Sequence, residues 1–337
     1  MTADSPASRQ RRPVRRLAAT GLVVLLAVLS AIGTINLLPV GGGIAVEGPL
    51  AVHRTAQTAS PPDGELPNDA LLPPGAPSPV TLSVPAGPHL AVPILYYHYI
   101  RTIQPTAQNL LSFNLSIPPT LFAEQMALLQ VEGAHPITLA TLMEALAGKR
   151  GLPARPVVLT FDDGYADFAT VVQPVLARYG FVATDFVVSG FVNKPRYMSA
   201  AQILKMEAAG MVVGSHTVHH VDLAAVPLSA AWLEIANGKN ALEKLLGHPV
   251  LDFAYPYGGF NAVVAQLVQQ AGFREAVTTM NGNEQSLNGR YELHRTGMGG
   301  APSLATFAQA AGVPLPSPVQ LASISVLATS PSAPRSE

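Results

Sequence analysis

The feature that most restricts the fold of this chain is a repeated alternation of short apolar runs with amphipathic segments, over about 225 residues from His89 to Val313. The apolar runs have the length of strands and are Val92–Tyr97, Val157–Phe161, Phe181–Val188, Met211–Gly214, Val250–Ala254 and Glu275–Thr279. The amphipathic segments are Pro119–Val131, Leu139–Ala147, Tyr165–Tyr179, Ser199–Ala209, Leu228–Leu246 and Asn261–Ala271. This alternation predicts an α/β fold in which helices surround a parallel sheet, either as a barrel or as a doubly wound sheet.

The N-terminal region differs sharply from this core. An uncharged, mostly apolar run at residues 17–40 is long enough to cross a bilayer as a helix. Arginines lie just before the run and not soon after it, which predicts that residues 1–16 are a basic cytoplasmic segment and that the rest is extracytoplasmic. The alternative is a cleaved signal peptide, although the run exceeds the usual apolar length of about 7–15 residues.

Composition separates three further regions. Residues 41–89 are rich in Pro, Gly and Ala and are predicted to form a linker, residues 90–315 are predicted to form the folded domain, and residues 316–337 are predicted to be a disordered tail.

Charged residues make up 12% of the chain and the net charge is -1, so the basic field that a nucleic-acid partner requires is missing. The absence of cysteine excludes disulfides, thiolate metal ligands and a cysteine nucleophile.

Four of the predicted strands lead directly into residues that can take part in chemistry. In parallel β/α folds, functional groups gather at the carboxyl ends of the strands. The residues are His98, the pair Asp162 and Asp163, the histidines of "SHTVHH" (His216, His219 and His220), and the loop "YPYGGFN" that contains Tyr257. Each feature alone is commonly a turn or a surface histidine, but their joint placement favours an active site.

The spacing of these residues narrows the chemistry. His216 and His220 are four residues apart and therefore share a face in a helical or an extended backbone. Gly164 allows the chain to turn after the adjacent aspartates, so that both can reach one pocket. Two imidazoles and one carboxylate form a three-ligand set for a divalent cation, with the second carboxylate free to act as a base. The same set could hold iron for oxygen chemistry, so spacing alone does not identify the metal.

Several of these motifs resemble those of a known protein family. "TFDDGY" and "SHTVHH" are similar to the first two motifs of the polysaccharide deacetylase family, carbohydrate esterase family four. "VPILYYHYI" and "FAYPYGGFN" resemble more closely the branch that deacetylates exported poly-N-acetylglucosamine. The resemblance implies a distorted (β/α) barrel with fewer than eight repeats and a divalent metal, usually Zn²⁺. It also implies that Asp163, His216 and His220 are the metal ligands.

The same resemblance implies catalytic roles. Asp162 would be the general base, Tyr257 would offer its backbone N–H to the oxyanion, and His98 would be the general acid. "LHRTGM" partly resembles a later motif of the family, which makes His294 a rival to His98. Many relatives carry an arginine that orients the base at the position of Ala254, so the orienting group must come from elsewhere, and Arg295 is the candidate.

The sequence therefore predicts a membrane-tethered, extracytoplasmic, metal-dependent hydrolase that removes N-acetyl groups from an amino-sugar polysaccharide. Its predicted partners are an N-acetylated polysaccharide and, through the N-terminal helix, the membrane. Two alternatives keep the fold, namely a peptidoglycan N-deacetylase and an O-acetyl esterase. A third, of another class, is a catalytically inert carbohydrate-binding protein of the cell envelope. The intact set of Asp162, Asp163, His216 and His220 argues against inertness.

Overall fold

The computed structural model describes residues 87–329. The predicted cytoplasmic segment, the predicted anchor at 17–40, most of the predicted linker and residues 330–337 lie outside this range. Within residues 87–329, no helix combines the length and the apolar character that crossing a membrane requires.

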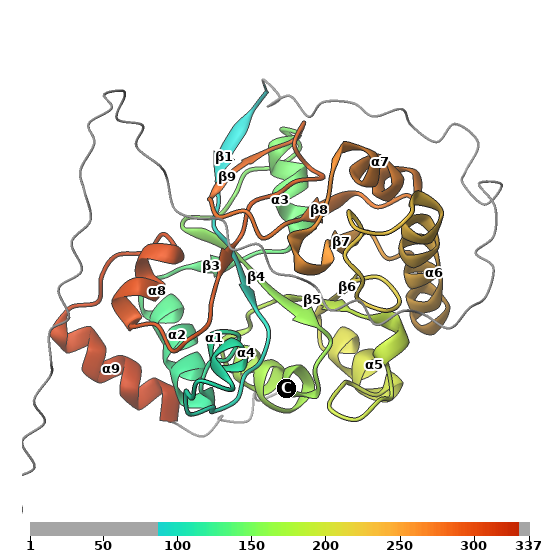
Figure 1. Ribbon diagram of the computed structural model, residues 1–337. Helices are drawn as coiled ribbons and strands as arrows, with labels where there is room; N and C mark the ends of the chain where they lie inside the picture. Colours follow the sequence, from blue (N-terminus) through green and yellow to red (C-terminus); the bar gives the residue numbers. More distant parts are fainter. Residues whose placement is uncertain (1–86, 330–337) are drawn as a thin grey trace, which may run out of the picture. The chain divides into compact units, whose positions relative to one another are not determined.

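A curved parallel sheet forms the centre of the domain (Figure 1). Its strands are β2 (Ile94–Tyr97), β4 (Pro156–Asp163), β5 (Thr184–Val187), β6 (Val212–Ser215), β7 (Asp252–Ala254), β8 (Glu275–Val277) and β10 (Thr296–Gly297). They lie in the order β10-β2-β4-β5-β6-β7-β8 and all pair in parallel. The predicted α/β class is confirmed, as a half-barrel of parallel strands that is consistent with a distorted barrel.

Three short strands lie outside this path. β3 (His135–Pro136) pairs with β4, whereas β1 (His89–Ala91) and β9 (Glu284–Ser286) form a separate antiparallel pair. The segment before β10 also contacts β8, because the Thr278 N–H donates to the carbonyl of Leu293 at 2.9 Å. The segment from Leu293 to Gly297 is therefore bonded to β8 at its start and to β2 at its end.

Helices follow most of the strands, as the alternation predicts. They are α1 (Leu110–Asn114), α2 (Pro119–Val131), α3 (Leu139–Leu146), α4 (Gln173–Tyr179), α5 (Ala200–Ala208), α6 (Leu228–Leu246), α7 (Ala262–Gln270), α8 (Leu304–Ala310) and α9 (Pro318–Thr329). The side chains of Thr138, Ser199 and Asn261 cap the starts of α3, α5 and α7 by accepting backbone N–H groups. The predicted helix at Tyr165–Tyr179 is helical from residue 166 and contains a π-helical turn, Phe168–Val172, that leads into α4.

The alternation of side chains along β4 sets the direction of its functional residues. Val157, Leu159 and Phe161 belong to the hydrophobic cluster that includes the buried residues of α2, whereas Val158 belongs to a second cluster with Ile94 of β2. Since successive strand residues point to opposite faces, Thr160 and Asp162 share the face of Val158. That inner face is where Asp162 meets its partner, described below.

The predicted disordered tail is wrong for most of the described residues in it. Residues 318–329 form α9, which packs against α2 and buries Ile324 to 1% exposure. Ser317 and Gln320 form a reciprocal cap at its start, with the Ser317 N–H donating to Gln320 Oε1 and the Gln320 N–H donating to Ser317 Oγ. This spacing of Ser and Gln is a capping-box signal that the sequence carries and that composition alone conceals.

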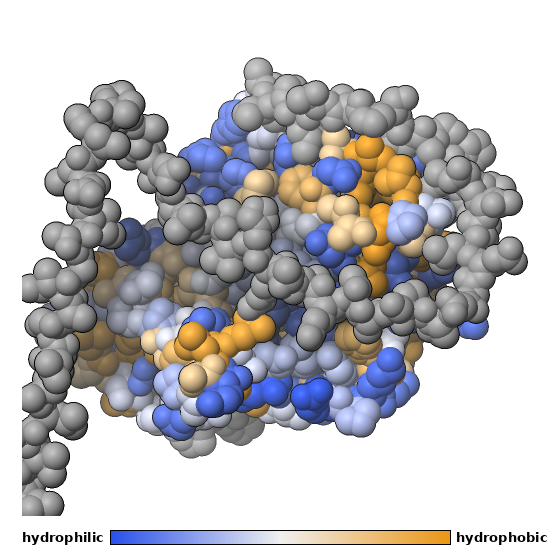
Figure 2. All heavy atoms as spheres, in the orientation of Figure 1, coloured by the Kyte–Doolittle hydropathy of each residue, from blue (hydrophilic) through white to orange (hydrophobic). Residues whose placement is uncertain are grey.

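The loop from Arg101 to Ile117 contains α1. Its end is tied to the residue that follows His98, because the Tyr99 N–H donates to the Leu115 carbonyl and the Ile117 N–H donates to the Tyr99 carbonyl. α1 exposes about half of Leu110 and Leu111, and Figure 2 shows a hydrophobic patch over this region. This hydrophobic patch therefore lies on a loop that is hydrogen-bonded to the residue next to His98.

Candidate metal and catalytic site

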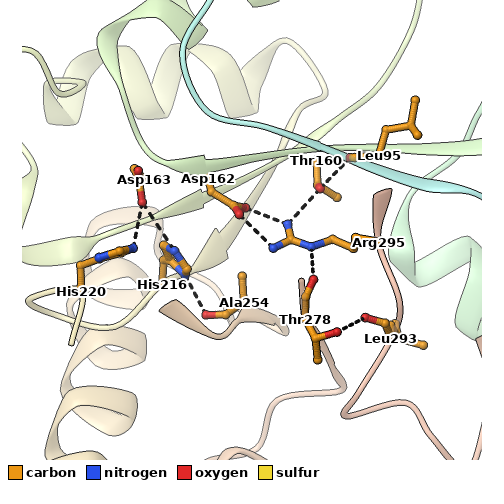
Figure 3. A network of polar contacts seen from close by, with 10 residues as sticks. All are labelled: Leu95, Thr160, Asp162, Asp163, His216, His220, Ala254, Thr278, Leu293 and Arg295. Atoms are coloured by element: carbon orange, nitrogen blue, oxygen red, sulfur yellow. Dashed lines mark hydrogen bonds and ion pairs between the residues drawn. The ribbon is translucent and has the colours of Figure 1, made fainter. Parts of the chain in front are cut away.

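Three side chains from two strand ends converge on one point (Figure 3). Asp163 is the last residue of β4, His216 directly follows β6, and His220 lies one short loop further on. Asp163 Oδ1 is 3.5 Å from His216 Nε2 and 3.2 Å from His220 Nε2. The structure thus brings together the three residues that the sequence predicts as metal ligands.

The protonation states of His216 and Asp163 suit the binding of a cation. His216 Nδ1 donates to the carbonyl of Ala254 at 2.7 Å, so its Nε2 carries the lone pair that faces Asp163. Burial lowers the pKa of His216 to about 4, and the ring is therefore neutral at neutral pH. Asp163 Oδ1 is buried and has no hydrogen-bond partner among residues 87–329. A buried carboxylate oxygen without a donor, facing two imidazoles, is the donor set that a divalent cation satisfies.

The backbone at Asp163 explains how neighbouring carboxylates serve different partners. Asp163 has φ 81° and Gly164 has φ 73°, so the expected turn at Gly164 begins one residue earlier, at the second aspartate. A left-handed conformation is strained for a residue with a Cβ atom, and strained residues cluster at functional sites. The turn points Asp163 toward the histidines and leaves Asp162 on the inner face of the sheet (Figure 3).

Asp162 is held by a buried arginine. Arg295 donates from Nη1 to Asp162 Oδ1 at 2.8 Å and from Nη2 to Asp162 Oδ2 at 2.9 Å, which is a bidentate pair. Burial by itself would raise the pKa of Asp162, but the charge and hydrogen bonds of Arg295 hold it below its ordinary value. Asp162 is therefore ionised at neutral pH and able to accept a proton.

The guanidinium group of Arg295 is itself fixed on every side. Its side chain is fully buried, Nε donates to the Thr278 carbonyl at 2.7 Å, and Nη1 donates to Thr160 Oγ1 at 3.1 Å. The guanidinium also lies 4.5 Å from the ring centroid of Tyr96. Ala254, where many relatives have an arginine, accepts a hydrogen bond from His216 through its carbonyl. The positive charge beside Asp162 comes instead from Arg295, in the segment just before β10. Thr160 and Tyr96 were not identified from the sequence, because a strand threonine and a strand tyrosine carry no motif.

The two candidate acids occupy different surroundings. His98 lies edge-on to Tyr96 at 5.8 Å between ring centroids. Burial raises the pKa of both aspartates, and the charge of His98 is among the smaller contributions that lower it. His294 lies next to Gly282, where an added Cβ would come within 2.7 Å of its Nδ1. Its backbone is bonded to the side chain of Gln285. The charge of His98 therefore acts on both aspartates, whereas His294 packs against Gly282 and Gln285.

Tyr257 lies beside a metal-ligand candidate. Its ring is edge-on to His220 with 4.5 Å between centroids, and its side chain is 69% exposed. It is the second residue of the 3-10 turn Pro256–Gly258, where a backbone N–H has no acceptor within the turn. Gly258 follows at φ 73°, and a Cβ there would be 2.0 Å from Thr279 Oγ1, so only glycine fits. The turn thus places Tyr257 next to His220.

Comparison with known proteins agrees with this geometry. The family model for polysaccharide deacetylase matches residues 149–276, which include Asp162, Asp163, His216, His220 and Tyr257. The Bacillus subtilis protein YxkH, named as a polysaccharide deacetylase, is 27% identical over 204 residues, which cover 60% of this chain and 70% of that protein. The poly-β-1,6-N-acetyl-D-glucosamine N-deacetylase of Escherichia coli is 38% identical over 81 residues, 24% of this chain and 12% of that protein.

A solved structure supports the same relationship. The Streptococcus pyogenes deacetylase PplD, determined in complex with acetate, matches with a TM-score of 0.61 and 28% identity. The match covers 66% of this chain and 98% of that protein. It therefore extends well beyond the 149–276 region.

Proposed function

Because the chain belongs to the polysaccharide deacetylase family and is a hydrolase of that family, we propose that it removes N-acetyl groups from an amino-sugar polysaccharide similar to poly-N-acetylglucosamine. The observation that carries the proposal is that the two adjacent carboxylates have different partners. Asp163 faces two imidazoles, and Asp162 is held by Arg295. The names of the Escherichia coli relative and of the acetate complex of PplD support this substrate class and this product.

The proposed cofactor is a divalent cation held by Asp163, His216 and His220. We propose Zn²⁺, since two imidazole nitrogens and one carboxylate oxygen are a common catalytic zinc set. When bound, such a cation supplies Lewis acidity and lowers the pKa of water to about 7.

The remaining chemistry belongs to the side chains and backbone of the protein. Asp162 takes a proton from the attacking water, and Arg295 keeps the carboxylate ionised and oriented toward it. The backbone N–H of Tyr257 stabilises the oxyanion that forms as water adds to the amide carbonyl. His98 gives a proton to the departing amine, which cannot leave as an anion. The products are acetate and a free glucosamine unit.

Acetate release from defined glycans tests this proposal. The purified protein, loaded with Zn²⁺, is expected to release acetate faster from poly-N-acetylglucosamine than from peptidoglycan or an O-acetylated glycan. Removal of the metal with a chelator is expected to abolish the release, and added Zn²⁺ to restore it. Faster release from either other glycan would reassign the substrate, and a metal-loaded protein that releases no acetate from any of them would refute the enzymatic function.

A second prediction separates His98 from His294. On an amide substrate, His98→Ala is expected to lower the rate by roughly 10²–10⁴-fold, the usual contribution of a positioned acid. On an activated aryl acetate the loss is expected to be much smaller, since that leaving group needs no proton. His294→Ala is the matched control and is expected to affect both substrates little. Equal losses on the two substrates for His98→Ala, or a selective loss for His294→Ala, would contradict the assignment.

We also propose that the domain works outside the cytoplasm, tethered by residues 17–40. This proposal rests on the apolar run and the arginines that precede it. The native protein is then expected in the membrane fraction at full-length mass after high-salt and alkaline washes. A soluble form beginning between about residues 32 and 47 would identify a cleaved signal peptide.

A further inference from the structure

The short loop between the two metal-ligand histidines has a strained backbone. Thr217 has φ 66° and His220 has φ 59°, and both residues carry a Cβ atom that disfavours this left-handed region. These turns bring His216 and His220 to the same carboxylate oxygen of Asp163. A strained conformation persists only where surrounding contacts impose it, so the loop requires partners outside itself.

One side chain of α6 supplies such contacts. Glu234 Oε2 accepts the backbone N–H groups of Val218 at 3.0 Å and His219 at 2.8 Å. Its other oxygen, Oε1, lies 2.7 Å from His219 Nδ1. The side chain of Glu234 is only 14% exposed, whereas its partner His219 is largely exposed. A single carboxylate thus binds two consecutive residues that immediately precede His220.

Other contacts fix the opposite side of the loop. The N–H groups of Ser189 and Gly190 donate at 3.0 Å to the carbonyls of Thr217 and Val218. Within the loop, the His220 N–H donates to Thr217 Oγ1 at 2.9 Å. The carbonyls are therefore held from the β5 side, and the N–H groups of Val218 and His219 are held from the α6 side by Glu234.

The helix that carries Glu234 lies directly against the loop. Gly238 is one turn further along α6, and an added Cβ there would be 2.9 Å from the Thr217 carbonyl carbon. Ala231, Ile235 and Leu242 of the same helix are buried in the core. Glu234 therefore projects from a rigid support, at a distance that only a glycine at position 238 permits.

We propose that Glu234 is a positioning residue that sets the affinity of the Asp163, His216 and His220 site for its cation by holding the loop in its strained form. The proposal deepens the proposed function and rests on the metal site assigned there. It also explains His219, whose imidazole is 64% exposed and binds Glu234. His219 belongs to the set of contacts by which Glu234 holds the loop, and it is not a fourth metal ligand.

Titration of the metal-free full-length protein with Co²⁺ tests this role without any glycan. We expect Glu234→Ala to weaken Co²⁺ binding by roughly 10–100-fold, as loss of a group supporting a metal ligand usually does, and to alter the visible absorption of the bound Co²⁺. Glu234→Gln keeps an oxygen for the two N–H groups and is expected to lose less. Glu207→Gln breaks a similar glutamate–histidine pair, with His248, remote from the loop, and is expected to leave affinity unchanged.

The outcomes separate positioning from general stability. Wild-type Co²⁺ affinity in Glu234→Ala would overturn the proposal. The proposal would also be overturned if Glu234→Ala lost Co²⁺ affinity only because its metal-free form unfolds at the assay temperature, and if Glu234→Gln bound Co²⁺ as the wild type does. Because Co²⁺ binding is measured alone, a wild-type protein that binds the cation but releases no acetate would refute the proposed function and leave the role of Glu234 standing.

Discussion

Asp163→Ala is expected to abolish cation binding and deacetylation together, whereas Asp162→Asn is expected to keep the cation and lose turnover. Asp163 is the only charged member of a three-ligand set, and its buried oxygen has no other partner among residues 87–329. Asp162 instead faces Arg295, and an amide in its place cannot take a proton from water. The expected loss of turnover for Asp162→Asn is roughly 10²–10⁴-fold. Equilibrium dialysis with Zn²⁺ and an acetate-release assay measure the two effects.

Asn and Asp have nearly the same shape, so Asp162→Asn also serves as a control for packing. If this variant lost the cation while Asp163→Ala retained it, the roles of the two carboxylates would be reversed. If both lost the cation and activity equally, the pair would act as one metal-binding unit and the assignment of a separate base would fail.

Arg295→Met is expected to destabilise the domain strongly as well as to inactivate it. The substitution leaves the Asp162 carboxylate, which is 3% exposed, without its bidentate partner. Removal of one member of a buried ion pair typically costs about 3–5 kcal/mol, a large part of the roughly 5–15 kcal/mol that stabilises a folded domain. Urea unfolding of the metal-free protein measures this loss.

Two further variants define the cause of that loss. Adding Asp162→Asn to Arg295→Met removes the unpaired charge and is expected to restore part of the stability without restoring activity. Arg150→Met breaks an ion pair with Glu144 in which both side chains are about half exposed, and is expected to cost no more than about 1 kcal/mol. If Arg295→Met unfolded at the same urea concentration as Arg150→Met, the buried pair would not support the fold.

Most of the central fold could be predicted because its elements carry strong local signals. The helix at Pro119–Val131 has the predicted bounds, and the predicted strand Val157–Phe161 lies within β4. The two-residue strands were not predicted. β10 has only two residues and β3 also has two, so neither carries a periodic pattern, and their pairing depends on the rest of the sheet.

The candidate site likewise contains residues that the sequence could identify and residues that it could not. The metal-ligand candidates could be found because motif spacing and strand ends placed them together. The contact between Arg295 and Asp162 could only be a guess, since the residues are 133 positions apart and no pattern in sequence links them. Glu234 lies in the middle of an ordinary amphipathic helix, where a glutamate is common, and its contact with the histidine loop became visible only in three dimensions.

The position of Arg295 in the segment that joins β8 to β2 has a consequence for the order of events during synthesis. The ribosome completes His220, the last of the metal-ligand candidates, 75 residues before it reaches Arg295 (295 minus 220). At about 5–20 residues per second this interval lasts about 4–15 s. Until Arg295 arrives, burying Asp162 would leave its charge uncompensated, so the end of β4 cannot reach its final state. The pair of Asp162 and Arg295, and with it the proposed base, is therefore completed only after His216 and His220 have been synthesised.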